Sequence, residues 1–322
     1  MKKIILCDWV DVVDQYNIPA TLKKKLLEKG KEFNIEFIFK NSFDSSDYCK
    51  MPFAYIGNRP EKLITSLPSI KWIHFGSVGT DRIDVKEFKS KGGLVSNAKN
   101  IFDDAVSTTA ISFILSYLIP RNKNFDADSF SRQYWEKNVQ KISGTQIIVL
   151  GHGCISQKLC EKLNNLGLGV MALTRSPKKY IKSNYKVLSL SELELLKQYS
   201  NKIIINLLPS KEQTIGFVNS KFFQCVGDIF AYINIGRIDT ENEESVLVAL
   251  QKNYLQYAHW DVIRSYEKMS SYKVKFDNRV SFTPHISSFS INHWEKTIDL
   301  VINNLNALNN YGNFKFRNDV DE

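Results

Sequence analysis

The chain has 322 residues, of which 43% are hydrophobic and 24% charged, so it can bury a large core. Chains of this length usually fold as two domains rather than one. The formal charge of +9 is spread along the chain and is not interleaved with aromatic residues. We therefore expect small anionic ligands and no nucleic acid, although a merely solvated lysine-rich surface would give the same charge.

Cysteine usage and apolar runs indicate the compartment. The five cysteines are scattered, odd in number and without a CxxC pair, which argues against a disulfide framework and a zinc site. The first apolar run meets Asp8 too early for a signal peptide, and the longest nearly apolar run, residues 110–119, is about half the length that a bilayer requires. We expect a cytoplasmic protein with no membrane segment and no metal site.

The first part of the chain alternates between strand and helix patterns. Short apolar runs predict strands at residues 2–7, 35–39, 53–56 and 71–75. Amphipathic stretches such as 19–33 predict helices between them. A long helix is then expected from Asp103 or Asp104, either of which could cap it, to Pro120. This alternation is typical of a parallel sheet covered by helices on both faces.

The alternation restarts in the second part of the chain. The expected strands are 146–150, 169–174, 202–208, 229–235 and 256–262. The expected helices are 154–166, one near 191–198, one near 219–225 and one near 241–252. A last helix over 291–312 would end at Gly312, a usual helix stop. A second α/β unit is therefore predicted.

A glycine-rich loop joins the first strand and helix of this second unit. In Gly151-His152-Gly153, the first glycine permits a tight turn and the second lets the backbone approach a pyrophosphate at the helix N-terminus. Ser156 replaces a third glycine, whose role is only to let the helix pack closely on the strand. We interpret the loop as a dinucleotide site, although flavin and methyl-transfer proteins also carry such loops.

The end of the next strand bears on which dinucleotide binds. An NAD site would place an acid here for the ribose 2′-hydroxyl, but the chain has Thr174-Arg175-Ser176, followed by Lys178 and Lys179. A guanidinium beside a hydroxyl suits a 2′-phosphate, which a carboxylate would repel. NADP(H) is therefore preferred and NAD(H) remains possible. An ordinary exposed arginine after a strand would look the same.

Seven segments carry a resemblance to a known family: residues 67–100, 105–115, 142–156, 205–219, 233–250, 258–263 and 282–288. In this order they are similar to the D-isomer-specific 2-hydroxyacid dehydrogenases, most closely the glyoxylate/hydroxypyruvate reductase branch. The likeness runs from about residue 66 to 312. Together the segments are specific, whereas each alone is not.

The resemblance also implies an architecture. The fold class would be α/β, with two doubly wound parallel-sheet (Rossmann-like) domains, the first of them discontinuous. Residues 1–100 plus 290–322 would bind the substrate, and residues 101–289 the dinucleotide. A homodimer is implied as well, with residues 125–138 as its arm.

The resemblance implies a catalytic set of arginine, glutamate and histidine. Arg237 would clamp the substrate carboxylate, and His285 would protonate the carbonyl oxygen as hydride arrives. Asp261 matches an aspartate near the nicotinamide. By spacing, the family's glutamate falls on Tyr266, one residue before Glu267. A one-residue loop adjustment would let Glu267 hold the imidazole and raise its pKa.

The remaining site residues are contacts to cofactor and substrate. Those expected at the cofactor are Gly151, Gly153, Cys154, Ile155, Thr174, Arg175, Ser176, Leu208, Pro209 and Asp261. Those expected at the substrate carboxylate, through backbone amides, are Ser77, Val78 and Gly79. The sequence departs from the family where Ile238 replaces a glycine, Thr108 a glutamate and Cys154 a basic residue.

Three functional hypotheses remain open. The first is NADPH-dependent reduction of a small 2-oxo acid to a D-2-hydroxy acid, with closure of the domains over the substrate. The second, favoured by the departures, is an NAD(P)-binding sensor or assembly protein with little turnover. The third is a biosynthetic dehydrogenase for a larger, sugar-linked or phosphorylated oxo acid. No motif names the oxo acid.

Overall fold

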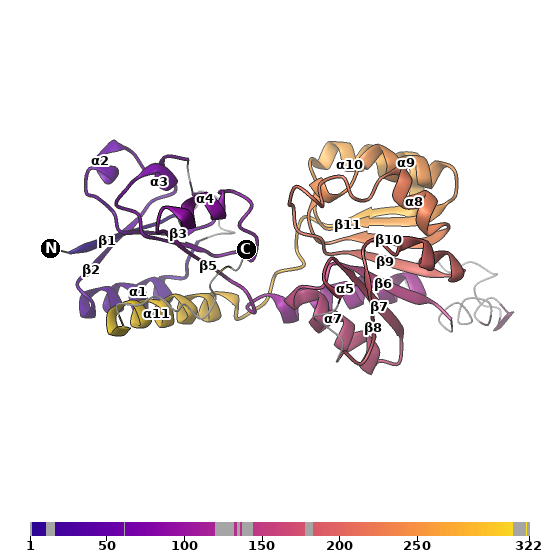
Figure 1. Cartoon of the computed structure of the whole chain (residues 1–322), viewed down its shortest axis with the longest axis horizontal. Coiled ribbons are helices and arrows are strands. Elements are labelled where there is room, and N and C mark those ends of the chain that lie inside the picture. Colours follow the sequence, from indigo (N-terminus) through magenta and orange to yellow (C-terminus); the bar gives the residue numbers. More distant parts are fainter. Residues whose placement is uncertain are drawn as a thin grey trace. The chain divides into compact units, whose positions relative to one another are not determined.

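The computed structural model describes residues 2–10, 17–60, 62–119, 132–133, 136, 144–177, 183–311 and 320 (Figure 1). It divides into two compact units, Met1–Phe102 with Ser290–Glu322, and Asp103–Phe289. Most of the predicted dimer arm, together with Lys178, Lys179 and Gly312, lies outside the described residues. Within the described part of the chain, no helix is both long enough and apolar enough to cross a membrane.

Unit 1 is built on a five-stranded parallel sheet. Its strand order is β2-β1-β3-β4-β5, with β1 at Lys3–Cys7, β2 at Ile35–Phe39, β3 at Ala54–Gly57, β4 at Trp72–Phe75 and β5 at Leu94–Asn97. Alternate residues point to opposite faces. Ile5 and Cys7 join one core cluster, whereas Leu6 between them joins another. Both faces are therefore buried, as in parallel sheets generally.

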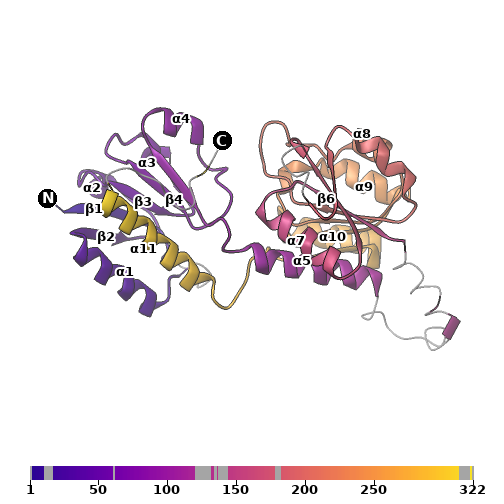
Figure 2. The ribbon, with the colours of Figure 1, turned by 60° about the horizontal axis from the view of Figure 1, so that its bottom comes forward.

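Helices cover both faces of this first sheet. Helices α1 (Ala20–Glu32) and α11 (His293–Tyr311) lie side by side on one face, so the C-terminal segment completes the unit that the N-terminus begins (Figures 1 and 2). The other face carries three short helices, α2 (Ser45–Tyr48), α3 (Lys62–Ser66) and α4 (Val85–Ser90).

Unit 2 is built on a seven-stranded parallel sheet of order β12-β11-β10-β9-β6-β7-β8. The strands are β6 (Gln146–Leu150), β7 (Gly169–Thr174), β8 (Lys186–Ser189), β9 (Lys202–Asn206), β10 (Ile229–Asn234), β11 (Leu255–Trp260) and β12 (Val280–Phe282). Each of these strands pairs in parallel with its neighbours in the sheet.

The helices of unit 2 lie on both faces of its sheet. One face carries α8 (Ser220–Val226), α9 (Glu243–Gln251) and α10 (Tyr266–Phe276), and the other carries α5 (Asp103–Leu118) and α7 (Cys154–Asn165) (Figure 1). The short helices η4 (Leu193–Gln198), η5 (Ile238–Thr240) and η6 (Asp277–Arg279) are of the 3₁₀ type. The predicted fold class, two doubly wound parallel-sheet domains with the first discontinuous, is confirmed.

Both sheets have a point at which the strand order reverses. In unit 1 it lies between β1 and β3, and in unit 2 between β6 and β9. In open parallel sheets, ligands bind outside the carboxyl ends of the strands at such a point. The loops that follow β6, β7, β9, β10, β11 and β12 all leave that edge of the second sheet, and they contain most of the predicted site residues.

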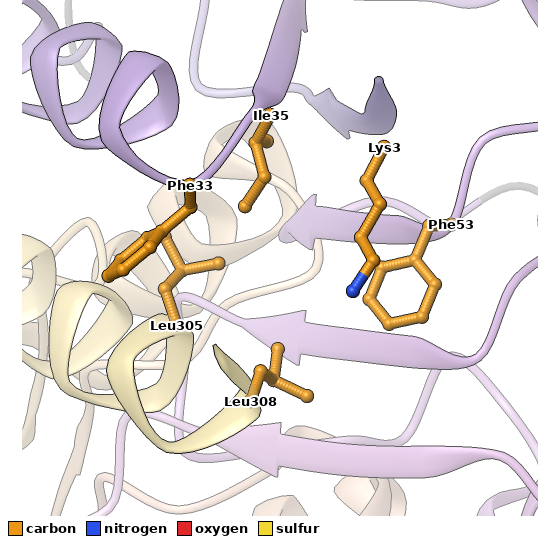
Figure 3. A pocket seen from close by; sticks show the side chains of 6 residues that line it. All are labelled: Lys3, Phe33, Ile35, Phe53, Leu305 and Leu308. Atoms are coloured by element: carbon orange, nitrogen blue, oxygen red, sulfur yellow. The ribbon is translucent and has the colours of Figure 1, made fainter. Parts of the chain in front are cut away.

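A small apolar hollow lies at the amino ends of the strands of the first sheet. Its volume is about 20 Å³, room for a single water molecule. Figure 3 shows the side chains around it, those of Lys3, Phe33, Ile35, Phe53, Leu305 and Leu308. The Lys3 amine lies 5.2 Å from the centre of the Phe53 ring. The hollow is too small for a metabolite and lies at the wrong end of the strands for the predicted ligands.

Candidate active site

The glycine-rich loop has the backbone that a dinucleotide turn requires. Gly151 has a φ of +93°, and a Cβ built on it would lie 2.9 Å from the carbonyl oxygen of Leu207. Its amide donates to the Leu173 carbonyl at 2.8 Å, which ties the turn to the end of β7. No residue other than glycine fits this position without strain.

Helix α7 begins immediately after the loop and has no side-chain cap. Gly153 is the residue before the helix and provides no side-chain cap, and the first turn contains no acid. A Cβ on Gly153 would meet nothing within 4 Å. Ser156, in place of the third glycine, is 2% exposed and packs into the unit. The loop therefore leaves room for an anion at a helix N-terminus, where backbone N–H groups favour it.

The buried His152 of the loop pairs with the half-buried Tyr185. His152 donates or accepts a hydrogen bond to the Tyr185 hydroxyl at 2.8 Å, and the two rings pack edge to face. Burial lowers the pKa of His152, which favours the neutral ring. No sequence pattern predicts Tyr185 at this position, since it lies 33 residues further along the chain.

The turn after β7 holds the residues expected to select the dinucleotide. Arg175 is exposed and donates to the Gln213 side chain at 3.1 Å, while Ser176 beside it is also exposed. Gln213 belongs to the loop after β9, so two loops at the same edge of the sheet hold the guanidinium. Thr174 is the last residue of β7. This turn contains no carboxylate that would repel a 2′-phosphate.

The loop after β9 lies against the loop after β10. Leu208 is buried and its amide donates to the Asn206 side chain at 3.1 Å, whereas Pro209 is exposed. A Cβ on Gly236 would come within 3.0 Å of the carbonyl oxygens of Asn206 and Leu208. The two backbones are thus in close contact next to Arg237.

Arg237 follows β10 at the start of η5. It is half-buried, and its guanidinium donates to the Gly236 carbonyl at 3.0 Å. Ile238 lies inside η5 and does not have a positive φ, so the backbone does not need glycine there.

Thr108 lies on α5, where its hydroxyl accepts from Lys162 of α7 at 2.7 Å. Cys154 is half-buried in the first turn of α7.

His285 is presented by a turn that wraps around one buried carboxylate. Asp261 accepts from the Thr283 hydroxyl at 2.6 Å, from the Ile286 amide at 2.9 Å and from the Ser287 amide at 3.1 Å. The His285 amide donates to the Asp261 carbonyl at 2.8 Å. His285 itself has a φ of +57°, a conformation that costs free energy for residues other than glycine. Asp261 therefore holds the turn in a strained shape.

Two charges act on the His285 ring. Burial lowers its pKa from 6.5, the Arg237 guanidinium lowers it further, and the Asp261 carboxylate opposes them by raising it. Glu267 is not among these charges, and it is exposed on the first turn of α10. The structure thus brings Arg237, Asp261 and His285 together and leaves Glu267 apart, so a supporting role for Glu267 stays a prediction.

The predicted substrate loop lies in unit 1, beyond the end of β4. The Ser77 carbonyl accepts from the Ala98 amide at 3.1 Å, the Val78 carbonyl from the Asn97 side chain at 2.7 Å, and the Gly79 carbonyl from the Ser77 hydroxyl at 2.9 Å. Because all three carbonyls accept hydrogen bonds, the path of the loop is fixed. Its contact with a substrate stays a prediction. Among the described residues no group of three potential metal ligands occurs.

Residues 115–287 match the family model of the D-isomer specific 2-hydroxyacid dehydrogenase, NAD binding domain. The chain belongs to the D-isomer-specific 2-hydroxyacid dehydrogenase family. The match spans the glycine loop, Arg237, Asp261 and His285. Family membership confirms the prediction of an NAD(P)-dependent dehydrogenase.

Individual relatives of this dehydrogenase agree with the predicted branch. It is 24% identical over 262 residues to a glyoxylate/hydroxypyruvate reductase of Arabidopsis thaliana, covering 79% of each chain. It is 27% identical over 263 residues to a hydroxyphenylpyruvate reductase of Plectranthus scutellarioides, covering 79% of this chain and 81% of that protein. The resemblance to the glyoxylate/hydroxypyruvate reductase branch is confirmed.

A solved structure shares the fold over nearly the whole chain. The NADPH-dependent glyoxylate/hydroxypyruvate reductase of Sinorhizobium meliloti, in complex with NADP and malonate, superposes with a TM-score of 0.75 at 21% identity. The match covers 99% of this chain and 97% of that one. At this identity the likeness establishes the fold alone.

Proposed function

We propose that the protein reduces a small 2-oxo acid to a D-2-hydroxy acid with NADPH as the hydride donor. The observation that carries the proposal is the cluster of Arg237, Asp261 and His285 at the carboxyl edge of the second sheet, beside the glycine-rich loop. A permanent cation for a carboxylate and a titrating ring for a proton are the two groups that this reaction needs.

The dinucleotide fits the loops after β6 and β7. Gly153 and the N-terminal turn of α7, which has no side-chain cap, would hold its pyrophosphate, and Arg175 would hold the ribose end. Arg175 and Ser176 favour a 2′-phosphate. The further contacts proposed from Cys154, Ile155, Thr174, Leu208 and Pro209 belong to the same loops. When bound, the cofactor supplies a hydride to the carbonyl carbon of the substrate.

The side chains of this chain provide binding and the proton. Arg237 binds the substrate carboxylate and polarises the neighbouring carbonyl, and His285 gives a proton to the carbonyl oxygen as it becomes an alkoxide. Since the Arg237 charge depresses the pKa of His285, an anionic substrate that compensates this charge makes the ring easier to protonate. Substrate binding thereby prepares the acid.

A second function is favoured by one observation. Glu267 is exposed and is not among the charges that shift the pKa of His285, so the charge that raises this pKa comes from Asp261 and not from the glutamate that the family resemblance implies. A protein that binds NAD(P) as a sensor or in an assembly, with little turnover, would tolerate this. A homodimer and a cytoplasmic location also stay predictions.

The two functions are separated by NADPH oxidation on a panel of glyoxylate, hydroxypyruvate, pyruvate and bulkier 2-oxo acids. Under the first proposal the native protein turns over at least one of them, His285→Ala loses the activity, and the control His293→Ala keeps it. NADPH binding without turnover would favour the sensor.

Arg175→Ala should raise KM for NADPH by about ten-fold and leave KM for NADH unchanged, with exposed Lys186→Ala as its control.

A further inference from the structure

A buried carboxylate, that of Glu241, directly follows the turn that carries Arg237. The side chains that donate hydrogen bonds to it are all uncharged. Glu241 is 5% exposed and follows η5 directly. One of its oxygens accepts from the Tyr232 hydroxyl at 2.6 Å and the Asn234 amide group at 2.8 Å. Its other oxygen accepts from the Trp260 indole at 2.6 Å. Burying a charge among neutral donors is costly, so the position calls for a reason.

The partners of Glu241 connect it to Arg237. Asn234 ends β10, and its side-chain oxygen accepts from the Gly236 amide at 3.1 Å. Its amide group reaches both Glu241 and, at 3.4 Å, the Arg237 carbonyl. That carbonyl also accepts from the Thr240 hydroxyl at 2.6 Å. By accepting from the Asn234 amide group, Glu241 fixes the orientation of the Asn234 side chain. The backbone around Arg237 depends on this orientation, because the same side chain bonds the Gly236 amide and the Arg237 carbonyl.

The arrangement suits an ionised acid better than any neutral group of the same shape. The three side chains around Glu241 all donate to it, and a carboxylate can accept every one of these bonds. A glutamine or a protonated acid would direct a hydrogen of its own toward one of the donors. This conflict is greatest at the Trp260 indole N–H, because that group can donate a hydrogen bond but cannot accept one.

We propose that Glu241 is a positioning residue for Arg237, whose ionised carboxylate holds the turn that presents the guanidinium to the substrate carboxylate. This inference rests on the proposed function, because the task assigned to Arg237 comes from it. Glu241 touches neither cofactor nor substrate in this account and acts through Asn234.

The charge of Glu241 changes within the working range of pH. Burial raises its pKa to about 7, against the lowering effect of its hydrogen bonds to Tyr232, Asn234 and Trp260, and Glu243 of α9 raises it further. Tyr232 from β10 and Glu243 are the titratable groups that face it, while Asn234 and Trp260 are neutral. The fraction of ionised Glu241 in the folded protein therefore increases as pH rises through about 7.

The test compares Glu241→Gln with the native protein, and uses Glu243→Gln as the control for loss of a nearby acid. The ratio of KM for the oxo acid, variant to native, should be near one below pH 6, where native Glu241 is protonated and resembles glutamine. It should rise to about ten above pH 8, because a misplaced arginine weakens carboxylate binding. KM for NADPH should not change, and the Glu243→Gln ratio should stay near one both below pH 6 and above pH 8, since this substitution only shifts the pKa of Glu241 between these limits. A Glu241→Gln ratio that does not vary with pH would overturn the proposal.

A second variant tests the cause of the defect. In Glu241→Gln with Trp260→Phe, the indole donor that conflicts with the glutamine is gone, so KM for the oxo acid should return toward the value of Trp260→Phe alone. Additive effects of the two substitutions would contradict the proposed geometry. If Glu241→Gln does not fold, Tyr232→Phe replaces it. Loss of the Tyr232 hydrogen bond should raise the pKa of Glu241, and with it the pH at which KM for the oxo acid changes. If KM changes at the same pH as in the native protein, the proposal is overturned.

Hydrogen exchange gives a reading that does not depend on turnover. In Glu241→Gln, amides of residues 235–241 should exchange about ten-fold faster than in the native protein above pH 8, while those of 151–155 stay unchanged. If the native protein reduces no oxo acid, the proposed function fails, and this comparison alone decides whether Glu241 holds the turn. Equal exchange at 235–241 would show that it does not.

Discussion

His285 combines a strained backbone with a depressed pKa, and both properties come from its neighbours. Its positive φ is maintained because the Asp261 carboxylate takes the hydroxyl and amides of the residues on either side. The family resemblance implies that Asp261 lies near the nicotinamide. The structure adds a second task, since the same carboxylate shapes the turn that carries the histidine.

Asp261→Asn should therefore lower kcat far more than it changes cofactor affinity. One carboxylate oxygen becomes an NH₂ group facing N–H or O–H donors, so the turn loses an acceptor. We expect kcat to fall about ten- to a hundred-fold and the free energy of unfolding to fall by about 1–3 kcal/mol. Steady-state kinetics and urea unfolding measure both. Asp277→Asn, at an exposed position, is the control, and an unchanged kcat for Asp261→Asn would refute the second task.

The pH dependence of reduction should report the depressed pKa of His285. Reduction needs the protonated ring, and burial together with Arg237 lowers its pKa from 6.5. The kcat/KM for the oxo acid should therefore be highest at acidic pH and fall about ten-fold per unit once pH exceeds that pKa. Oxidation of the hydroxy acid should show the opposite slope. A midpoint above 6.5 would mean that a further acid, such as Glu267, supports the ring.

At the scale of elements, the start of helix α10 accounts for the exposure of Glu267. Its spacing in the sequence suggested a small loop adjustment. In the structure, Ser265 caps α10 by accepting from the Lys268 amide at 3.1 Å, so α10 begins at Tyr266. Glu267 consequently lies within the first helical turn on an exposed side. The spacing of a motif does not reveal such a cap.

The glycine loop was the element most completely predicted from sequence, because a strand, two glycines and a helix leave few backbone solutions. Gly151→Ala would place a side chain at positive φ and against the Leu207 carbonyl. We expect an unfolding penalty of at least about 1–3 kcal/mol and loss of measurable NADPH binding. Gly167→Ala, also at positive φ but with open space around it, should cost stability without affecting binding. Equal NADPH affinity in both variants would contradict the assigned role of the loop.

For the whole molecule, alternation of strands and helices predicted the class, while the strand order was not predicted and is known only from the structure. Local patterns do not determine which strands pair, since every buried parallel strand looks alike. The Glu241 network was not predicted at all. The stretch from Asp239 to Glu244 is rich in acids and reads as a solvated surface, and only the packing of η5 against Tyr232 and Trp260 buries one of them.

The proposed function depends on hydride passing from NADPH to the carbonyl carbon of a 2-oxo acid at this site. NADPH dideuterated at C4 of the nicotinamide, with mass and chiral analysis of the product, tests this step. We expect one deuterium on C2 of a D-2-hydroxy acid, with no label transferred by His285→Ala. A product of L configuration, or one without deuterium at C2, would contradict it.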